Sequence, residues 1–314
     1  MRWPLIRYMP GLTSIDFVRL APFAAVLSLV LVVASCLSFG VKHLNLGIDF
    51  AGGTQIEVAT PGPPPLGRLR AALDKLGDDA QVQGIGIGNA NSAMLRFKPA
   101  AGQDANLAVG HVRDSLAKEF PGIQFKQTVA ISPKVSGELL VAGFKALGIA
   151  VLLMMFYIWF RFQWQFGLGA VIALFHDVLL TIGILSALQI EFSANSIAAL
   201  LTVIGYSMNE KVITFDRLRE NLRKYRKTPL REVINLSENE RLSRTLITGA
   251  SALLALSGTL AIGGPALFPL VFTMAFGILV GTYSSVYVAL PLILIWGVNR
   301  GDAVEIITPQ GARP

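Results

Sequence analysis

Six apolar segments dominate the sequence, and each approaches the length that a helix needs to cross a bilayer. They cover about 20–40, 139–160, 166–188, 194–215, 246–263 and 269–297. A transmembrane helix needs about 20 mainly apolar residues. Only 15% of the 314 residues are charged, whereas a soluble chain carries about 25%. The pattern predicts a membrane protein with six transmembrane helices, and it excludes an ordinary soluble enzyme and a disordered chain.

The basic residues predict an orientation. The net charge is +7, and most of the excess lies beside apolar segments, above all between 217 and 245. The positive-inside rule explains this excess without a nucleic-acid partner. It places both termini and the 217–245 loop in the cytoplasm and the long polar insertion outside. The predicted parts are an N-terminal segment 1–18, a first span 19–41, an external domain 42–136, a five-helix bundle 137–297 and a tail 298–314.

The first span holds the only cysteine of the chain, Cys36. It follows Val-Ala-Ser, which is similar to a lipoprotein cleavage site, but the apolar run continues to Phe39, beyond the usual length of a signal core. We interpret the segment as a retained helix. One cysteine also excludes an internal disulfide bond, so the external domain depends on its own core.

The external domain has the alternating patterns of a mixed α and β fold. Strand-like segments occur at 54–59, 81–87, 92–97 and 123–131, and leucine-rich helical patterns occur at 66–76 and 104–120. The order is βαββαβ, which predicts a ferredoxin-like α+β domain between the first and second spans. His43 and His111 are isolated from other ligand types, so no metal site is predicted.

Ionisable residues inside a predicted span are candidates for function, because their burial in a membrane is costly. His176 and Asp177 lie in the third span, and Asn209, Glu210, Asp216 and Arg217 lie in or at the end of the fourth. We expect Glu210 to take up and release a proton and to pair with Arg244 at the start of the fifth span. The alternative is that such a pair only holds the bundle together.

A second interpretation of the same region is an intramembrane serine protease. Ser207 follows Gly205 in a Gly-x-Ser pattern, and His176 could act as its base. The nucleophile elbow also needs a glycine two residues after the serine. Asn209 stands there, so this interpretation is disfavoured and no catalytic residue is predicted.

Several motifs together resemble the SecD/SecF family of bacterial protein-export membrane proteins. Residues 47–54 (Gly-Ile-Asp-Phe-Ala-Gly-Gly-Thr) are similar to the segment that follows the family's first span, and 132–139, 176–178, 205–211, 215–221 and 243–245 are similar to later segments in order. The family-motif residues are Asp49, Gly52, Gly53, His176, Gly205, Tyr206, Ser207, Arg217, Glu220 and Asn221.

The resemblance implies a multi-pass protein of the bacterial inner membrane, with a periplasmic domain, that works with SecD, the SecYEG channel and YajC. It implies no cofactor and no enzyme activity, with protons as the coupling ion, as in resistance-nodulation-division exporters. The protein would use the proton-motive force to promote export of preproteins after the SecA stage. The acidic residue implicated in proton transport corresponds to Glu210, where the family usually has aspartate, and the implicated arginine corresponds to Arg244. A passive scaffold for SecD and a proton-coupled small-molecule exporter remain as alternatives.

Overall fold

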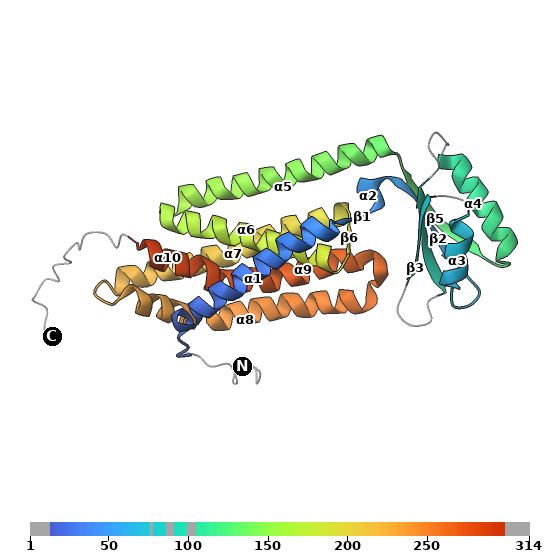
Figure 1. Ribbon diagram of the computed structural model, residues 1–314. Helices are drawn as coiled ribbons and strands as arrows, with labels where there is room; N and C mark the ends of the chain where they lie inside the picture. Colours follow the sequence, from blue (N-terminus) through green and yellow to red (C-terminus); the bar gives the residue numbers. More distant parts are fainter. Residues whose placement is uncertain (1–12, 76–77, 86–90, 99–104, 299–314) are drawn as a thin grey trace, which may run out of the picture.

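The computed structural model describes residues 13–75, 78–85, 91–98 and 105–298 of the chain. These residues form a bundle of long helices with a smaller sheet-containing domain at one end (Figure 1). The predicted segments 1–18 and 298–314 lie mostly outside the described residues.

The long helices of the bundle run roughly along a common direction (Figure 1). They are α1 (Phe17–Lys42), α5 (Pro133–Arg161), α6 (Trp164–Ala187), α7 (Ala194–Lys224), α8 (Leu230–Ile262) and α9 (Gly264–Ser284). A π-helical turn, η2 (Ser285–Ala289), and α10 (Leu290–Trp296) directly continue α9. Among the described residues, five segments are long and apolar enough to cross a membrane: Phe17–Lys42, Lys134–Arg161, Trp164–Ala187, Leu230–Ile262 and Leu267–Trp296.

Helix α7 is not among these five segments, although the sequence predicts a span at 194–215. It carries Glu210 and Lys211 near its middle and more charged residues toward Lys224. It nevertheless packs against α5, α6, α8 and α9. At about 1.5 Å per residue, its length of about 46 Å exceeds the thickness of a membrane core. Helix α7 is therefore long and packed inside the bundle, but its hydropathy does not mark it as a span.

The expectation of a basic loop at 217–245 is wrong. Helix α7 continues to Lys224 and α8 begins at Leu230, so only 225–229 connect them. Arg217 and Asn221 of α7 both bind the carboxylate of Glu240 on α8, at 2.8 and 2.6 Å. The apolar pattern ends before this region, but the helices extend through it because their charged and polar side chains pair across the interface.

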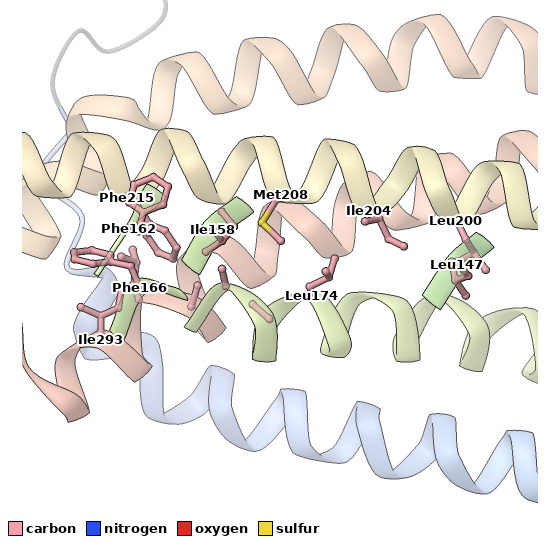
Figure 2. Packing of buried hydrophobic residues seen from close by; sticks show 14 of the residues in the cluster. Leu147, Ile158, Phe162, Phe166, Leu174, Leu200, Ile204, Met208, Phe215 and Ile293 are labelled. Carbon is pink, nitrogen blue, oxygen red and sulfur yellow. The ribbon is translucent and has the colours of Figure 1, made fainter. Parts of the chain in front are cut away.

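The apolar face of α7 lies at the centre of the bundle core. Leu200, Ile204, Met208 and Phe215 are buried against side chains of α5 and α6 (Figure 2). The ring of Phe215 meets that of Phe166 edge-on, with centroids 5.2 Å apart. This core fixes the rotation of α7 and therefore the directions in which its polar residues point.

Two glycines allow α9 to lie directly against α7. A Cβ atom at Gly277 would collide with the side chain of Val203, and one at Gly281 would lie 2.9 Å from the Cβ of Ser207. Small residues permit such close contact between membrane helices. The contact brings the backbone of α9 beside the polar residues of α7.

Residues 53–131 form the second unit, a four-stranded sheet with two helices on the face away from the bundle (Figure 1). Its elements are β2 (Gly53–Ala59), α3 (Leu66–Leu73), β3 (Asp78–Ile85), β4 (Ser92–Lys98), α4 (Ala105–Glu119) and β5 (Gln124–Ile131). The strand order is β3-β4-β2-β5, with every neighbouring pair antiparallel. Ile56 and Val58 alternate toward the helices and are buried with Leu69 and Leu116. The elements thus follow each other in the order βαββαβ.

A short helix and two glycines lead the chain from α1 into this sheet. Helix α2 (Ile48–Ala51) ends at Gly52, and the φ angles of Gly52 and Gly53 are 70° and 122°, values that favour glycine. Asp49 accepts a hydrogen bond from the backbone N–H of Ala194 at 2.9 Å. The motif at 47–54 therefore joins the start of the sheet to the start of α7.

The sheet is also tied to the connection between α6 and α7. Strand β1 (Asn45–Leu46) pairs in parallel with β6 (Glu191–Phe192) in that connection. The guanidinium of Arg96 on β4 lies 2.6 Å from the carboxylate of Glu191. These contacts connect a movement of α6 and α7 directly to the sheet.

The opposite end of the bundle holds the start of α1, the connection between α7 and α8, and the end of α10 (Figure 1). Asp16 caps α1 and also binds α8. A hydrogen bond of 2.7 Å from Asn235 and one of 3.0 Å from the backbone N–H of Arg19 hold the pKa of Asp16 below its ordinary value. The start of α1 and the basic part of α8 therefore lie on the same side of any membrane that the bundle crosses.

Candidate functional site: buried ion pairs on two sides of helix α7

Helix α7 places two adjacent charged residues in different parts of the bundle interior. Glu210 is 3% exposed and Lys211 is 0% exposed. Neighbouring residues of a helix point about 100° apart. Each side chain therefore meets different helices, and each is the centre of a separate polar cluster.

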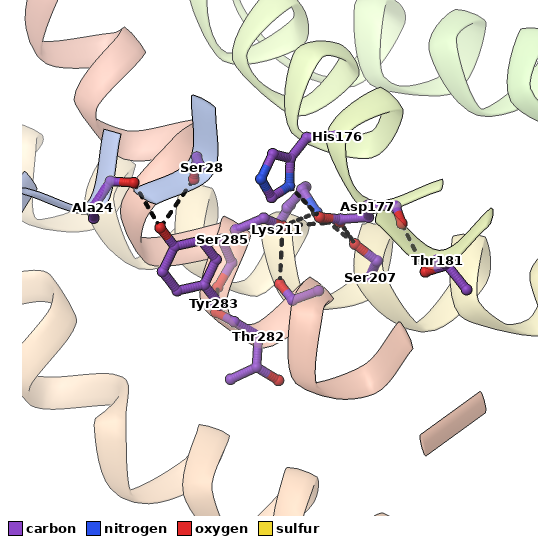
Figure 3. A network of polar contacts seen from close by, with 12 residues as sticks. Ala24, Ser28, His176, Asp177, Thr181, Ser207, Lys211, Thr282, Tyr283 and Ser285 are labelled. Carbon is purple, nitrogen blue, oxygen red and sulfur yellow. Dashed lines mark hydrogen bonds and ion pairs between the residues drawn. The ribbon is translucent and has the colours of Figure 1, made fainter. Parts of the chain in front are cut away.

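The first cluster, which we call the Asp177 cluster, consists of His176, Asp177, Ser207, Lys211 and Ser284 (Figure 3). The ammonium of Lys211 lies 2.7 Å from Oδ2 of Asp177 on α6, and it also donates to Ser207 and Ser284. Ser207 and Ser284 donate to the same Oδ2 at 2.5 and 2.8 Å. One positive and one negative charge therefore balance each other inside a hydrogen-bonded pocket.

His176 extends this cluster toward α1. Its Nδ1 lies 3.1 Å from Oδ1 of Asp177, and its ring stacks on Tyr283 with centroids 6.2 Å apart. The hydroxyl of Tyr283 donates to the backbone oxygen of Ala24 at 2.8 Å and lies 2.9 Å from the Ser28 hydroxyl (Figure 3). The cluster therefore links α6, α7 and α9 to the first helix.

The second cluster, which we call the Glu210 cluster, consists of Glu210, Glu238, Arg241, Thr245 and Ser285. Nη1 of Arg241 on α8 lies 2.5 Å from Oε1 of Glu210 and 2.7 Å from the hydroxyl of Thr245. The same guanidinium donates to both oxygens of Glu238, at 2.8 and 2.7 Å. The side chains of Glu210, Glu238 and Arg241 are at most 4% exposed.

The predicted pairing of Glu210 with Arg244 is wrong. Arg244 is exposed, and Arg241, three residues earlier, faces Glu210. Helix α8 buries Ile234, Glu238, Arg241, Thr245 and Gly249, which are spaced at three or four residues and so form one face. Arg244 lies off that face. The sequence contained this signal, but it becomes visible only if the helix is extended back to Leu230.

The two clusters meet the same point of the last span. Ser284 of the Asp177 cluster ends α9, and Ser285 of the Glu210 cluster begins the π-helical turn η2. Such turns are rare and occur frequently at functional sites. The change in helical winding directs two consecutive serines to the two sides of α7.

A third group of charges lies toward the end of the bundle opposite the sheet. Arg217 binds Glu220 at 2.6 Å and Glu240 at 2.8 Å. The amide of Asn221 donates to Glu240 and to Ser237. Three of the predicted family-motif residues, Arg217, Glu220 and Asn221, therefore lie together here, two to three turns from Glu210 along α7.

The remaining candidates lie apart from the buried clusters. Asp216 is exposed and pairs with Arg161 at 3.3 Å, and Asn209 is also exposed. Tyr206 is half-buried beside Glu210, and Gly205 precedes it on the same helix. Asp177 is buried, but its partner is Lys211, so it does not belong to the Glu210 cluster.

The geometry does not support a serine protease. The hydroxyl of Ser207 donates to Oδ2 of Asp177, and His176 contacts the other oxygen of that carboxylate. No described hydrogen bond joins Ser207 to His176. A nucleophile needs its base within hydrogen-bond reach, and here the carboxylate occupies that place.

The bundle and its buried charges define the class as a helical membrane protein with several spans. A family model described as "Protein export membrane protein SecD/SecF, C-terminal" matches residues 111–299, and one for the SecD/SecF GG motif matches 37–60. The chain is 43% identical over 306 residues to a protein translocase subunit SecF of Cereibacter sphaeroides, with 94% of each chain covered. It is 44% identical over 310 residues to a SecF of Rhodobacter capsulatus, covering 94% of this chain and 92% of that one. The chain belongs to the SecD/SecF family of protein export membrane proteins, and within it to the SecF group.

Solved structures agree with this assignment. A crystal structure of SecDF from Thermus thermophilus, titled a translocon-associated membrane protein, matches with a TM-score of 0.80 and 29% identity over 94% of this chain. A SecDF structure in a super-membrane-facing form matches with a TM-score of 0.65 and 31% identity over 90% of this chain. This chain spans only 40% and 39% of those two longer chains.

Proposed function

We propose that this chain is the SecF-type subunit of a protein export translocase and that it uses the proton-motive force through Glu210. The observation that carries the proposal is a carboxylate buried in the bundle and paired with Arg241 of another helix. Family membership supports a role in export. Protons are the coupling ion, and no other cofactor is required.

The proposed topology has six spans in the bacterial inner membrane, with α7 as the span that hydropathy omits. The end of the bundle with Asp16 and the 225–229 connection lies in the cytoplasm, because basic residues gather there. The sheet domain lies in the periplasm, and its βαββαβ order and antiparallel pairing support a ferredoxin-like class.

The proposed mechanism is a change of charge between two helices. With Glu210 ionised, Arg241 holds α8 against α7, and a proton on Glu210 weakens this attraction. Each charge that crosses the membrane supplies about 2.3 kcal/mol per 100 mV. A few protons per cycle are therefore enough to bias the bundle between two arrangements, provided that protonation changes their relative stability.

The sheet domain would receive this movement through its tethers to the bundle. Asp49 binds the first residue of α7, Arg96 pairs with Glu191, and β5 is followed at once by α5. We propose SecD as the direct partner and the SecYEG channel, with YajC, as the wider assembly. Preproteins that have passed the SecA stage are the proposed cargo. Arg244 stays a candidate by resemblance, on the exposed side of α8.

Glu210→Gln is expected to abolish the part of protein export that depends on the proton-motive force, because glutamine keeps the shape but cannot carry the proton. Glu210→Asp should retain most of it. The measurement is export by membrane vesicles with and without the force, with co-purification of SecD scored in the same samples. Glu232→Gln, an exposed carboxylate on α8, is the matched control.

The alternatives predict other outcomes. A passive scaffold predicts that Glu210→Gln loses SecD before it loses export. A small-molecule exporter predicts that protein export stays at the wild-type level in every variant.

A further inference from the structure

The guanidinium of Arg241 is shared unequally by two carboxylates. Glu238 lies on the same helix three residues earlier and holds Nε and Nη2 with both of its oxygens. Glu210 reaches only Nη1, from the neighbouring helix. A two-point contact of this kind is the stronger and more directional form of an arginine–carboxylate pair. Arg241 is therefore already neutralised within α8.

The cluster consequently holds one negative charge more than it can balance. Two carboxylates face one guanidinium, and all three side chains are buried. The neighbouring Lys211 is directed to Asp177 on the other side of α7 and closes a neutral pair there. An uncompensated buried charge costs several kcal/mol, so such groups neutralise themselves by binding a proton.

The other titratable groups facing this cluster carry no positive charge. Within the described residues, Tyr206 of α7 lies in the field of Glu210, and Tyr287 of η2 lies in the field of Glu238. Thr245 of α8 and Ser285 of η2 contribute neutral hydroxyls. Thr245 donates a hydrogen bond to Oε1 of Glu210 at 2.6 Å, and Arg241 donates to the same oxygen.

We propose that Glu238 sets the proton affinity of Glu210, and that Glu210, Glu238 and Arg241 together hold one proton at neutral pH. This inference rests on the proposed proton-coupled function and assigns a second carboxylate to its site. Glu238 acts as a positioning residue that engages Nε and Nη2 of Arg241 and leaves only Nη1 to Glu210. When the proton leaves, the surplus charge strengthens the attraction between Glu210 and Arg241, and the contact between α7 and α8 tightens.

The test is an infrared pH titration of the full-length chain in liposomes, which detects protonated carboxylic acids directly. Wild type should show such a signal at neutral pH, and Glu210→Gln should lose it. Glu238→Gln should also lose it at neutral pH, because Glu210 and Arg241 then form a balanced pair. In Glu238→Gln, the signal should return only when the proton concentration is at least about tenfold higher than in wild type. Glu238→Asp should titrate like wild type, because aspartate keeps the carboxylate.

Glu240→Gln is the matched control on the same helix, since Glu240 pairs with Arg217 outside the cluster. A wild type without the signal at neutral pH would overturn the inference even if no Glu238 variant folds, as would an unchanged titration in Glu238→Gln. If either of these infrared results were found while Glu210→Gln still lost force-dependent export, the proposed function would stand without this inference. A titration as expected, with wild-type export in Glu210→Gln, would instead remove the proposed function and leave the proton site.

Discussion

Lys211→Met is expected to destabilise the isolated chain by about 3–5 kcal/mol, because it leaves the carboxylate of Asp177 buried without its counter-ion. Both side chains are completely buried, and Lys211 also donates hydrogen bonds to Ser207 and Ser284. The measurement is thermal unfolding in detergent. Protonation neutralises the orphaned carboxylate, so the loss should be largest at high pH and should shrink as the pH falls.

A double variant separates the charge from the packing. Lys211→Met combined with Asp177→Asn removes both charges and should recover much of the loss, since a buried ion pair replaced as a whole is often close to neutral in stability. Lys145→Met is the control for lysine replacement, because Lys145 lies exposed on α5. Equal losses in Lys211→Met and Lys145→Met would show that the Asp177 cluster contributes nothing.

Arg241→Gln is expected to have an effect of similar size, about 3–5 kcal/mol, because it leaves Glu210 and Glu238 buried beside each other. The carboxylate that stays ionised beside Arg241 in the wild type loses its buried counter-ion, so the variant should bind an additional proton and be most stable at low pH. Thermal unfolding as a function of pH measures both consequences.

Arg244→Gln is the matched control three residues away. Its side chain is exposed, so its loss should change stability by about 0.5 kcal/mol or less. If Arg244→Gln were the more damaging of the two, Glu210 would pair with Arg244 after all, and the assignment of Arg241 to the buried face would fail.

The sequence predicts the parts of this protein that follow from regular patterns. Runs of apolar residues locate the bundle helices, and alternating residues locate the strands of the sheet domain. Glu210 stands out because an acidic residue inside an apolar helix is costly. These predictions need only local information, since the period of a helix or strand is visible within a short window.

The partners of the buried charges depend on information that a local window does not contain. Lys211 meets Ser284 because Gly281 and Gly277 bring α9 close to α7, and it meets Asp177 on α6. No spacing within one helix reveals either contact. The apolar segment of α8 begins only after Arg241, so the apolar pattern does not mark this residue. Helix α8 continues back to Leu230, however, through pairing with α7. The sequence therefore indicates which side chains are costly to bury, and the packing decides which of them meet.

In the proposed function, the charges of the Glu210 cluster drive export and do not merely hold the bundle together. The most direct measurement is proton-motive-force-dependent export by vesicles that carry the triple variant Glu210→Gln, Glu238→Gln, Arg241→Met, which removes all three buried charges at once. Because whole replacement of buried charges is often tolerated, the variant should fold and should co-purify with SecD. We predict that it exports without any force-dependent component. Force-dependent export at the wild-type level in this variant would show that these three charges do not couple protons to export.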